Sequence, residues 1–398
     1  MEKRYRAAIK GRRPVWKQIT AAVRARQSWM LERLRQLVEL ESPSNDKAAV
    51  DRAATLVASW CAELGGRVKR HRQHEYGDLL EVRFGPIRAK QKPVMLLGHL
   101  DTVWPLGTLA KMPWREDRQK IYGPGVYDMK AGVMMALTAI AALQDCAALQ
   151  TPIVMLLVSE EEIGSPVSRA LTEKIARTCS AAFVMEPAQG LQGAYKTARK
   201  GVGDYTLRVR GVAAHSGVDF EHGHSAVLEL ARLLAKVENF TDLKRGLTVN
   251  PGVIGGGTRS NVIAAEAWAE VDVRIVRAGD AAQVEKMFRG LRCADKHCTL
   301  EVSGGINRPP MERTAAIMKL FKRAQKIAAE MGVKLEEAAT GGGSDGNFTA
   351  AVGTPTLDGM GPIGEGAHAA HESLLKRSLV ERTVLLAGMV LGAWPDAR

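Results

Sequence analysis

Three short runs of apolar residues limit the folds that this chain can adopt. They occupy residues 93–97 (Pro-Val-Met-Leu-Leu), 153–158 (Ile-Val-Met-Leu-Leu-Val) and 181–185 (Ala-Ala-Phe-Val-Met). Each run has the length of a strand and none alternates with polar residues, which is typical of strands buried on both faces. Helical patterns lie between these runs. The sequence therefore predicts an α/β fold with a largely parallel sheet flanked by helices.

The hydrophobic pattern changes about halfway along the chain. Residues 205–210 and 267–274 alternate apolar and polar side chains with a period of two, which indicates a sheet with one covered face. A helical pattern follows each of these segments. We therefore predict a catalytic domain formed by residues 1–199 and 310–398, with a smaller α+β domain of residues 200–309 inserted into it.

Outside this insertion, the sequence predicts further helices and strands. The predicted helices cover about 1–41, 47–64, 128–144, 313–331 and 374–393, and further strands lie near 67–71 and 79–84.

Most of the net charge of +13 lies at the N-terminus. Residues 1–40 contain 11 Lys or Arg and 3 Asp or Glu. A basic extension of residues 1–30 could contact nucleic acid or acidic lipid, but a solvated helical extension is favoured because no aromatic-rich basic surface appears elsewhere. The five scattered cysteines form no Cys-x-x-Cys motif, which favours a reducing, cytoplasmic location. We expect neither a secretory signal nor a membrane-spanning run.

A histidine and an aspartate follow the first apolar run. His99 and Asp101 are two residues apart, so in an extended strand their side chains point to the same side. Open α/β sheets place their binding sites at the carboxyl ends of parallel strands. A lone His-x-Asp pair is more often a surface or capping pair, so the other strand ends must decide its meaning.

Acidic residues or a histidine recur at the later element ends. Asp128 follows a glycine-rich turn, residues 160–162 are three glutamates after the second apolar run, Glu186 follows the third run, and His368 lies near His371. Singly, each has an ordinary explanation, such as a helix cap, a solvated turn or a surface residue.

Together these residues indicate a metal site. Carboxylates crowded at one edge of a sheet repel one another unless a cation lies between them. Imidazole and carboxylate ligands without thiolates suit zinc or a similar divalent ion. Five candidate ligands are too many for one tetrahedral zinc ion, and suit two ions bridged by one carboxylate.

The motifs that carry these residues resemble those of the co-catalytic zinc aminoacylase/carboxypeptidase family. They occupy residues 98–103, 125–132, 161–165 and 185–187. The resemblance extends from about residue 30 to 395 and is closest to the carboxypeptidase G (glutamate carboxypeptidase) branch. It implies a zinc-exopeptidase-like catalytic domain with a mixed, mainly parallel sheet, and an inserted ferredoxin-like lid or dimerisation domain.

The resemblance also implies a role for each metal ligand. His99 and Glu186 would bind one zinc ion. Glu162 and His368 would bind the other. Asp128 would bridge both ions, and in this family the peptide bond after it is often cis. Cobalt or manganese could replace zinc.

Two further residues of the catalytic domain gain implied roles. Asp101 would hydrogen-bond to His99 and fix its tautomer. Glu161 would be the general base that takes a proton from the metal-bridging water. Glu160 is left without a role. The family pattern selects His368 over His371 because Glu372 then follows four residues later.

Four residues of the second half of the chain match the substrate-binding motifs of the family. His215 would reach across a dimer interface and stabilise the oxyanion, although an ordinary domain histidine is the alternative. Asn261 and Gly342 would bind the substrate. Arg274 would clamp its free carboxylate, unless it is merely an exposed strand residue. His224 departs from the asparagine common in relatives, which leaves the detailed structure of the lid open.

These residues together predict a dinuclear zinc hydrolase that cleaves an amide bond next to a free carboxylate, as a glutamate-carboxypeptidase-like exopeptidase. Its substrate would be a small peptide or an N-acyl amino acid, and the chain would form a homodimer through the lid, with no membrane or nucleic-acid partner. One alternative is an N-acyl-amino-acid deacylase of the acetylornithine deacetylase or succinyl-diaminopimelate desuccinylase type. Another is an inactive metal-binding homologue, which the presence of both Asp101 and Glu161 argues against.

Overall fold

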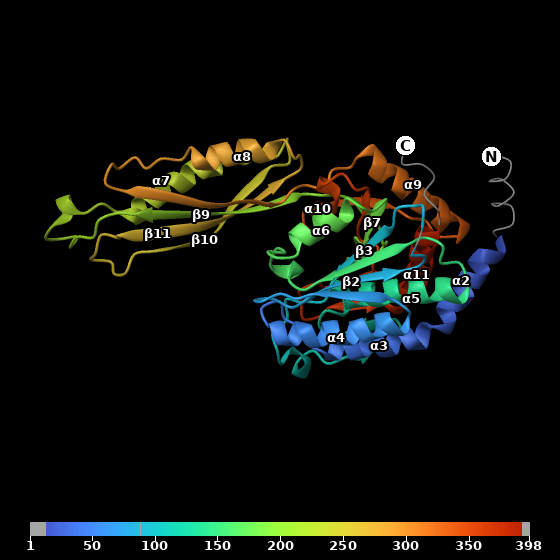
Figure 1. Cartoon of the computed structure of the whole chain (residues 1–398). Helices are drawn as coiled ribbons and strands as arrows, with labels where there is room; N and C mark the ends of the chain where they lie inside the picture. The colour runs from blue at the N-terminus through green and yellow to red at the C-terminus, as the bar shows by residue number, and fades with distance from the viewer. Residues whose placement is uncertain (1–12, 88, 392–398) are drawn as a thin grey trace. The chain divides into compact units, whose positions relative to one another are not determined.

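The computed structural model describes residues 13–87 and 89–391, so residues 1–12 of the predicted basic extension lie outside the described residues. The chain divides into two compact units (Figure 1). One holds the residues up to Thr197, Arg313–Ala339 and the residues from Ser344 onwards. The other holds Ala198–Glu312 and Thr340–Gly343.

A six-stranded mixed sheet forms the centre of the first unit. Its strands are β1 (Arg67–His71), β2 (Leu79–Phe84), β3 (Val94–His99), β6 (Ile153–Val158), β7 (Ala181–Val184) and β14 (Thr356–Leu357), in the spatial order β1-β2-β6-β3-β7-β14. The pairs from β6 to β14 are parallel, and the pairs that include β2 are antiparallel. Every residue of β3 and β6 is buried. The predicted α/β class with a mixed, mainly parallel sheet is confirmed.

Helices surround this sheet (Figure 1). They are α2 (Arg13–Ala25), α3 (Gln27–Glu39), α4 (Lys47–Glu63), α5 (Ala131–Asp145), α6 (Arg169–Ala176), α9 (Ala315–Glu330), α10 (Gly346–Ala351) and α11 (Lys376–Leu391). Helix α4 is capped by Asp46, whose side chain accepts a hydrogen bond from the backbone N–H of Ala49 at 2.9 Å. The single helix predicted over the first 41 residues is instead two helices within the described residues, because Arg26 leaves helical geometry.

Helix α5 is the core helix of the first unit, and its start differs from the prediction. Asp128 was expected inside a helix, but it lies in the turn Val126–Lys130 with an extended backbone (φ −115°, ψ 98°). This turn precedes α5, so Asp128 lies outside the regular helix. Gly132 lets the helix approach β7 closely, because a Cβ atom there would lie 2.0 Å from the carbonyl oxygen of Met185.

Contrary to our sequence expectation, one segment is long and apolar enough to cross a membrane. It is Val126–Asp145, and 94% of its apolar window is buried inside the protein. That burial is what a core helix of a globular domain requires, so the segment is weak evidence for a membrane span.

Short strands form two small sheets outside the central sheet. A four-stranded sheet has the order β15 (Gly364–Glu365), β16 (Ser373–Leu375), β5 (Lys120–Tyr122) and β4 (Arg115–Glu116). Strands β8 (Tyr195–Arg199) and β13 (Glu337–Thr340) form a two-stranded sheet, and the last residues of both strands belong to the second unit. The loop between β15 and β16 holds His368, so this small sheet fixes both ends of that loop.

The second unit is an antiparallel sheet with two helices. Its strands are β10 (Thr248–Gly256), β11 (Glu266–Ile275), β9 (Gly201–Arg210) and β12 (Thr299–Arg308), in that spatial order, and its helices are α7 (Ala226–Glu238) and α8 (Asp280–Arg289). Alternate residues of β9 and β11 pack with both helices in one apolar core. The predicted separate α+β sheet is confirmed. Sequence reasoning missed the edge strands β10 and β12, because β10 is mostly exposed and glycines interrupt the apolar pattern of both.

Candidate metal centre

The parallel strands of the first unit bring the predicted metal ligands to one edge of the sheet. His99 is the last residue of β3 and Glu186 follows β7. Glu162 lies in the 3₁₀ turn Glu161–Ile163 that follows β6. Because β6, β3 and β7 are parallel neighbours, their carboxyl ends meet. Asp128 and His368 reach the same place from the turn before α5 and the loop before β16.

The first group of potential ligands is His99, Asp128 and Glu186. The Nε2 atom of His99 lies 3.4 Å from Oδ1 of Asp128 and 3.5 Å from Oε1 of Glu186. Two ligand atoms that each lie about 2.0 Å from a tetrahedral zinc ion are about 3.3 Å apart. These separations therefore suit shared coordination better than direct hydrogen bonds.

The second group is Asp128, Glu162 and His368. The Nε2 atom of His368 lies 3.1 Å from Oε2 of Glu162 and 3.6 Å from Oδ2 of Asp128. Asp128 thus faces one histidine with each of its two oxygens. This is the arrangement that a bridging carboxylate needs.

Unsatisfied polar atoms fit a metal at these positions. Within the part of the chain that the structure describes, the buried atoms Nε2 of His99, Oδ1 of Asp128 and Oε1 of Glu162 have no hydrogen-bond partner. A buried polar atom without a partner is costly and requires an explanation. Coordination of a cation explains all of them, and the donor set of imidazoles and carboxylates suits a divalent ion such as zinc.

The electrostatics of the site lead to the same conclusion. Burial raises the pKa of Glu162 to about 7, against the hydrogen bond from His368 and with a further contribution from Asp128. The hydrogen bond to Glu162 raises the pKa of His368 to about 9. Burial acts to lower the pKa of His99, but the surrounding carboxylates raise it well above its usual value. The carboxylates thus require positive charge between them, which protons or a metal can supply.

Asp101 supports two parts of the site. Its carboxylate accepts hydrogen bonds from Ser44 Oγ at 2.7 Å and from the backbone N–H groups of Glu161 and Glu162 at 3.2 and 3.1 Å. Nδ1 of His99 lies 2.9 Å from the main-chain carbonyl of Asp101 and 3.4 Å from its carboxylate. A carbonyl only accepts, so Nδ1 carries the proton and Nε2 is left to bind metal.

The three successive glutamates, residues 160–162, do not form the solvated turn that is the ordinary explanation of such a run. Glu160 is fully buried, and its carboxylate accepts hydrogen bonds from Ser159 Oγ at 2.8 Å and from the backbone of Ser168 at 2.7 Å. It therefore holds the loop that follows β6. Glu161 begins the 3₁₀ turn, next to the predicted ligand Glu162.

Two buried charged residues gain contacts that sequence reasoning did not foresee. Glu372, which served only to select His368, is fully buried and accepts backbone hydrogen bonds from the Asp128 turn. Lys130 donates to the carbonyl of Leu40 at 2.8 Å, and burial lowers its pKa to about 7 against the nearby carboxylates of Glu372, Glu41 and Asp101. The available signals were the position of Lys130 inside the motif of residues 125–132 and the spacing of four residues between His368 and Glu372. The peptide bond Asp128–Met129 is cis.

The predicted substrate residues lie in the second unit. His215 is exposed, and its Nδ1 accepts a hydrogen bond from the backbone of Gly217 at 3.1 Å. The segment of His215 pairs with that of Asn261, since the Ser216 N–H donates to the carbonyl of Asn261 at 3.0 Å. The structure thus brings these two predicted residues onto adjacent segments.

The guanidinium of Arg274 already pairs with a carboxylate of the protein in this structure. Its guanidinium contacts the carboxylate of Asp272 at 2.6 Å, and its Nη1 lies 3.5 Å from the carbonyl of Gly341. The neighbouring carbonyl of Gly342 accepts a hydrogen bond from Arg199 at 3.0 Å. A substrate carboxylate would therefore have to compete with Asp272 for Arg274.

His224 belongs to a polar cluster of the second unit. Its Nδ1 lies 2.8 Å from the carboxylate of Asp295, and its ring stacks on His297 with centroids 4.1 Å apart.

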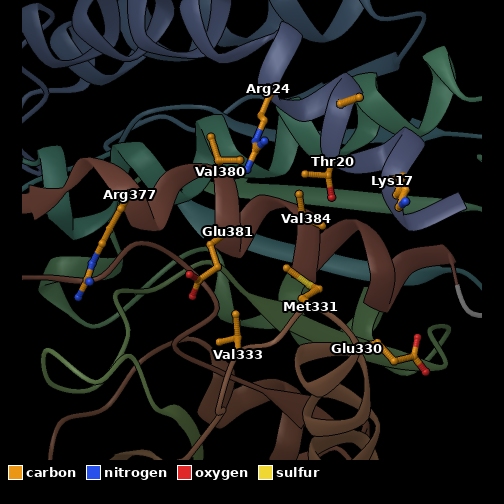
Figure 2. Close-up of a pocket in the computed structure, with 11 residues that line it drawn as sticks. Lys17, Thr20, Arg24, Glu330, Met331, Val333, Arg377, Val380, Glu381 and Val384 are labelled. Atoms are coloured by element: carbon orange, nitrogen blue, oxygen red, sulfur yellow. The ribbon is translucent and has the colours of Figure 1, made fainter. Parts of the chain in front are cut away.

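A cavity of about 630 Å³ lies elsewhere in the first unit. It is lined by residues of α2 and α11 and by the end of α9 (Figure 2). Basic, acidic and apolar side chains line it, among them Arg24, Glu330 and Val384. None of the predicted site residues is among the described residues that line this cavity. A smaller cavity of about 240 Å³ includes His371 and Glu372, next to the loop of His368.

Comparison with known proteins identifies the family. Residues 95–392 match the model of peptidase family M20/M25/M40. The chain belongs to this family. It is a hydrolase of the metallopeptidase type, so the predicted family and enzyme class are confirmed.

Relatives and solved structures agree with this assignment. The chain is 28% identical over 371 residues to carboxypeptidase G2 of Pseudomonas sp. (strain RS-16), covering 91% of this chain and 88% of the relative. Its fold is similar to that of aminopeptidase PepT from Bacillus cereus (TM-score 0.75, 22% identity, 92% of this chain and 98% of that chain). It also resembles the M20 metallo-carboxypeptidase Sso-CP2 from Sulfolobus solfataricus (TM-score 0.72, 16% identity, 91% and 98%). At these identities the structural matches concern the fold alone.

Proposed function

We propose that this family member is a dinuclear metallo-carboxypeptidase that hydrolyses an amide bond next to a free carboxylate. The observation that carries the proposal is the pair of ligand groups that share Asp128. The similarity to carboxypeptidase G2 along most of both chains supports a carboxypeptidase. The resemblance of the motifs to the glutamate carboxypeptidase branch suggests glutamate as the residue released. The substrate would be a small peptide or an N-acyl amino acid.

Each predicted residue has one task in this proposal. Two zinc ions, or cobalt or manganese in their place, would lower the pKa of a bridging water and polarise the scissile carbonyl. His99 and Glu186 would hold one ion, Glu162 and His368 would hold the other, and Asp128 would hold both. Glu161 accepts the proton of the attacking water and passes it to the leaving amine.

The resemblance to the family implies residues that bind the rest of the substrate. His215 donates a hydrogen bond to the oxyanion. Arg274 would exchange its contact with Asp272 for the substrate carboxylate, and Asn261 and Gly342 would complete that subsite. A carboxylate bound by a guanidinium fork is the selection expected of a carboxypeptidase.

The substitution Glu161→Gln tests the central step. It preserves the size of the side chain but removes its basicity, so we expect both metal ions to stay bound while kcat falls by about 10²–10⁴-fold. Metal content and hydrolysis of C-terminal glutamate amides, dipeptides and N-acyl amino acids are measured together. Glu330→Gln, on the exposed end of α9, is the matched control. Wild-type rates for the Glu161 variant on every cleaved amide would refute the base assignment.

The same substrate panel separates the second candidate function. A deacylase of the acetylornithine deacetylase type would cleave N-acyl amino acids and leave dipeptides and glutamate amides intact. The sequence match to carboxypeptidase G2 favours faster cleavage of glutamate amides and dipeptides than of N-acyl amino acids.

We also propose a homodimer formed through the second unit. Strand β10 is an edge of its sheet, and Val253 and Ile254 on it are 48% and 63% exposed. An exposed apolar edge strand is suited to pairing with a second copy. Light scattering on the wild type and on Ile254→Lys tests this, and a wild-type monomer at micromolar concentration would contradict it.

A further inference from the structure

Glu372 lies at the end of the loop that carries His368. It follows His368 by four residues and directly precedes β16, and its side chain is fully buried. Its carboxylate is not a member of either ligand group among the described residues. A buried carboxylate outside the metal site needs partners that offset its desolvation.

Four hydrogen-bond donors surround this carboxylate. Its Oε1 accepts from the backbone N–H groups of Tyr127 at 2.9 Å and Asp128 at 3.1 Å. Its Oε2 accepts from the backbone N–H of Gly125 at 2.8 Å and from Nε1 of Trp104 at 2.8 Å. Burial raises the pKa of Glu372, while these donors favour its ionised form.

The donors come from the segments that carry the metal ligands. Trp104 follows the end of β3, which provides His99. The turn of residues 125–128 provides Asp128, whose own backbone N–H is one of the donors. Glu372 itself belongs to the loop of His368. One carboxylate therefore connects three ligand-bearing segments that are far apart in the sequence.

We infer that Glu372 is the positioning residue that fixes the bridging Asp128 relative to His99 and His368. This inference rests on the proposed dinuclear centre. A bridging carboxylate must place each of its oxygens toward a different ion, and small rotations of its backbone disturb both ions at once. The hydrogen bonds of Glu372 to residues 125, 127 and 128 hold that backbone without occupying any oxygen of Asp128.

The substitution Glu372→Gln tests the inference. The amide matches the carboxylate in size, but its NH₂ group would face two of the four N–H donors, so at least two hydrogen bonds are lost. We expect the affinity for metal ions to fall by about 10–100-fold. Affinity is measured by competition with a chromophoric chelator, and the geometry by the visible absorption spectrum of the cobalt(II)-loaded protein, which should change.

Two further variants give the control and a milder test. Glu365→Gln is the matched control, because Glu365 lies in the same loop region and pairs with Lys120 rather than with the turn of Asp128. Trp104→Phe removes one donor only, so we expect a loss of affinity of a few-fold. This variant decides the question if Glu372→Gln does not fold.

The outcomes separate this inference from the proposed function. If the chelator competition curves and cobalt spectra of both Glu372→Gln and Trp104→Phe superimpose on those of the wild type, Glu372 does not position the centre. A wild type that binds two metal ions without hydrolysing any amide would overturn the proposed function, while the loss of affinity in Glu372→Gln would still support the positioning role.

Discussion

At the scale of single residues, the carboxylates around this site divide into two kinds. Asp128 and Glu162 each keep a buried oxygen without a hydrogen-bond partner among the described residues. Asp101 and Glu372 instead have their oxygens directed at N–H and O–H donors. The first kind is suited to bind a cation and the second to hold loops in place. Residue type alone does not distinguish them.

The substitution Asp101→Asn should therefore impair the site without removing a ligand. Both oxygens of Asp101 face donors, so the NH₂ group of the variant would oppose an N–H or O–H group in either orientation. We expect kcat/KM to fall by about 10–100-fold with an unchanged far-ultraviolet circular dichroism spectrum. Ser44→Ala removes one hydrogen bond from the same carboxylate and should have a smaller effect. Equal rates for Asp101→Asn and the wild type would show that the carboxylate is dispensable.

At the scale of elements, buried charges also connect helices to strands. Asp78 precedes β2 and is 7% exposed. Its carboxylate contacts Nζ of Lys47, the first residue of α4, at 2.9 Å, and accepts the backbone N–H of Gln73 at 3.0 Å. Burial acts to raise the pKa of Asp78, but these two partners lower it below its usual value.

This pairing predicts a pH-dependent contribution to stability. Because the folded-state pKa of Asp78 lies below the unfolded value of about 3.9, its contribution is present above pH 4 and is lost as the pH falls through the folded value. Asp78→Asn should therefore lower the melting temperature at pH 7 more than at pH 3. Thermal unfolding of both proteins across this pH range measures the difference. A constant difference would mean that the charge of Asp78 does not contribute.

At the scale of the whole molecule, the candidate metal centre involves distant parts of the first unit. Its candidate ligands lie at the end of β3, after β6 and β7, or in the loops next to α5 and β16, so they span residues 99 to 368 of the chain. Ions held by such ligands bind the folded state and not the unfolded chain. Their binding free energy therefore adds to the stability of folding.

Removal of metal should consequently destabilise the first unit. At a free ion concentration 100 times the dissociation constant, one site contributes about 2.7 kcal/mol. We expect a chelator to lower the melting temperature measured by scanning calorimetry, and zinc to restore it. Glu161→Gln should respond like the wild type, because Glu161 belongs to neither ligand group. A melting temperature that is independent of chelator would argue against bound metal.

Local sequence determined the central strands and the identity of the candidate ligands. Strands β2 and β6 begin and end at the predicted residues. β6 is an apolar run bounded by polar residues, which has few alternative structures. The edge strand β10 could not be predicted, since its Pro251 and its glycines interrupt the period-two pattern. In β12 the alternation covers only residues 299–303 before two glycines, which is too short a pattern to be distinctive. Likewise, the spacing of His99 and Asp101 predicted a shared side but not that the main-chain carbonyl of Asp101 would be the nearer partner of the imidazole.

Only the tertiary structure decided which donors form hydrogen bonds with each acidic residue. The sequence by itself determined that His99, Asp128, Glu162, Glu186 and His368 follow element ends, since hydrophobic periodicity is local. It did not reveal that Glu372 lies against Asp128, 244 residues away. Hydrogen bonds between such distant segments depend on the order of strands in the sheet and on how the loops close, and neither is encoded in any local pattern.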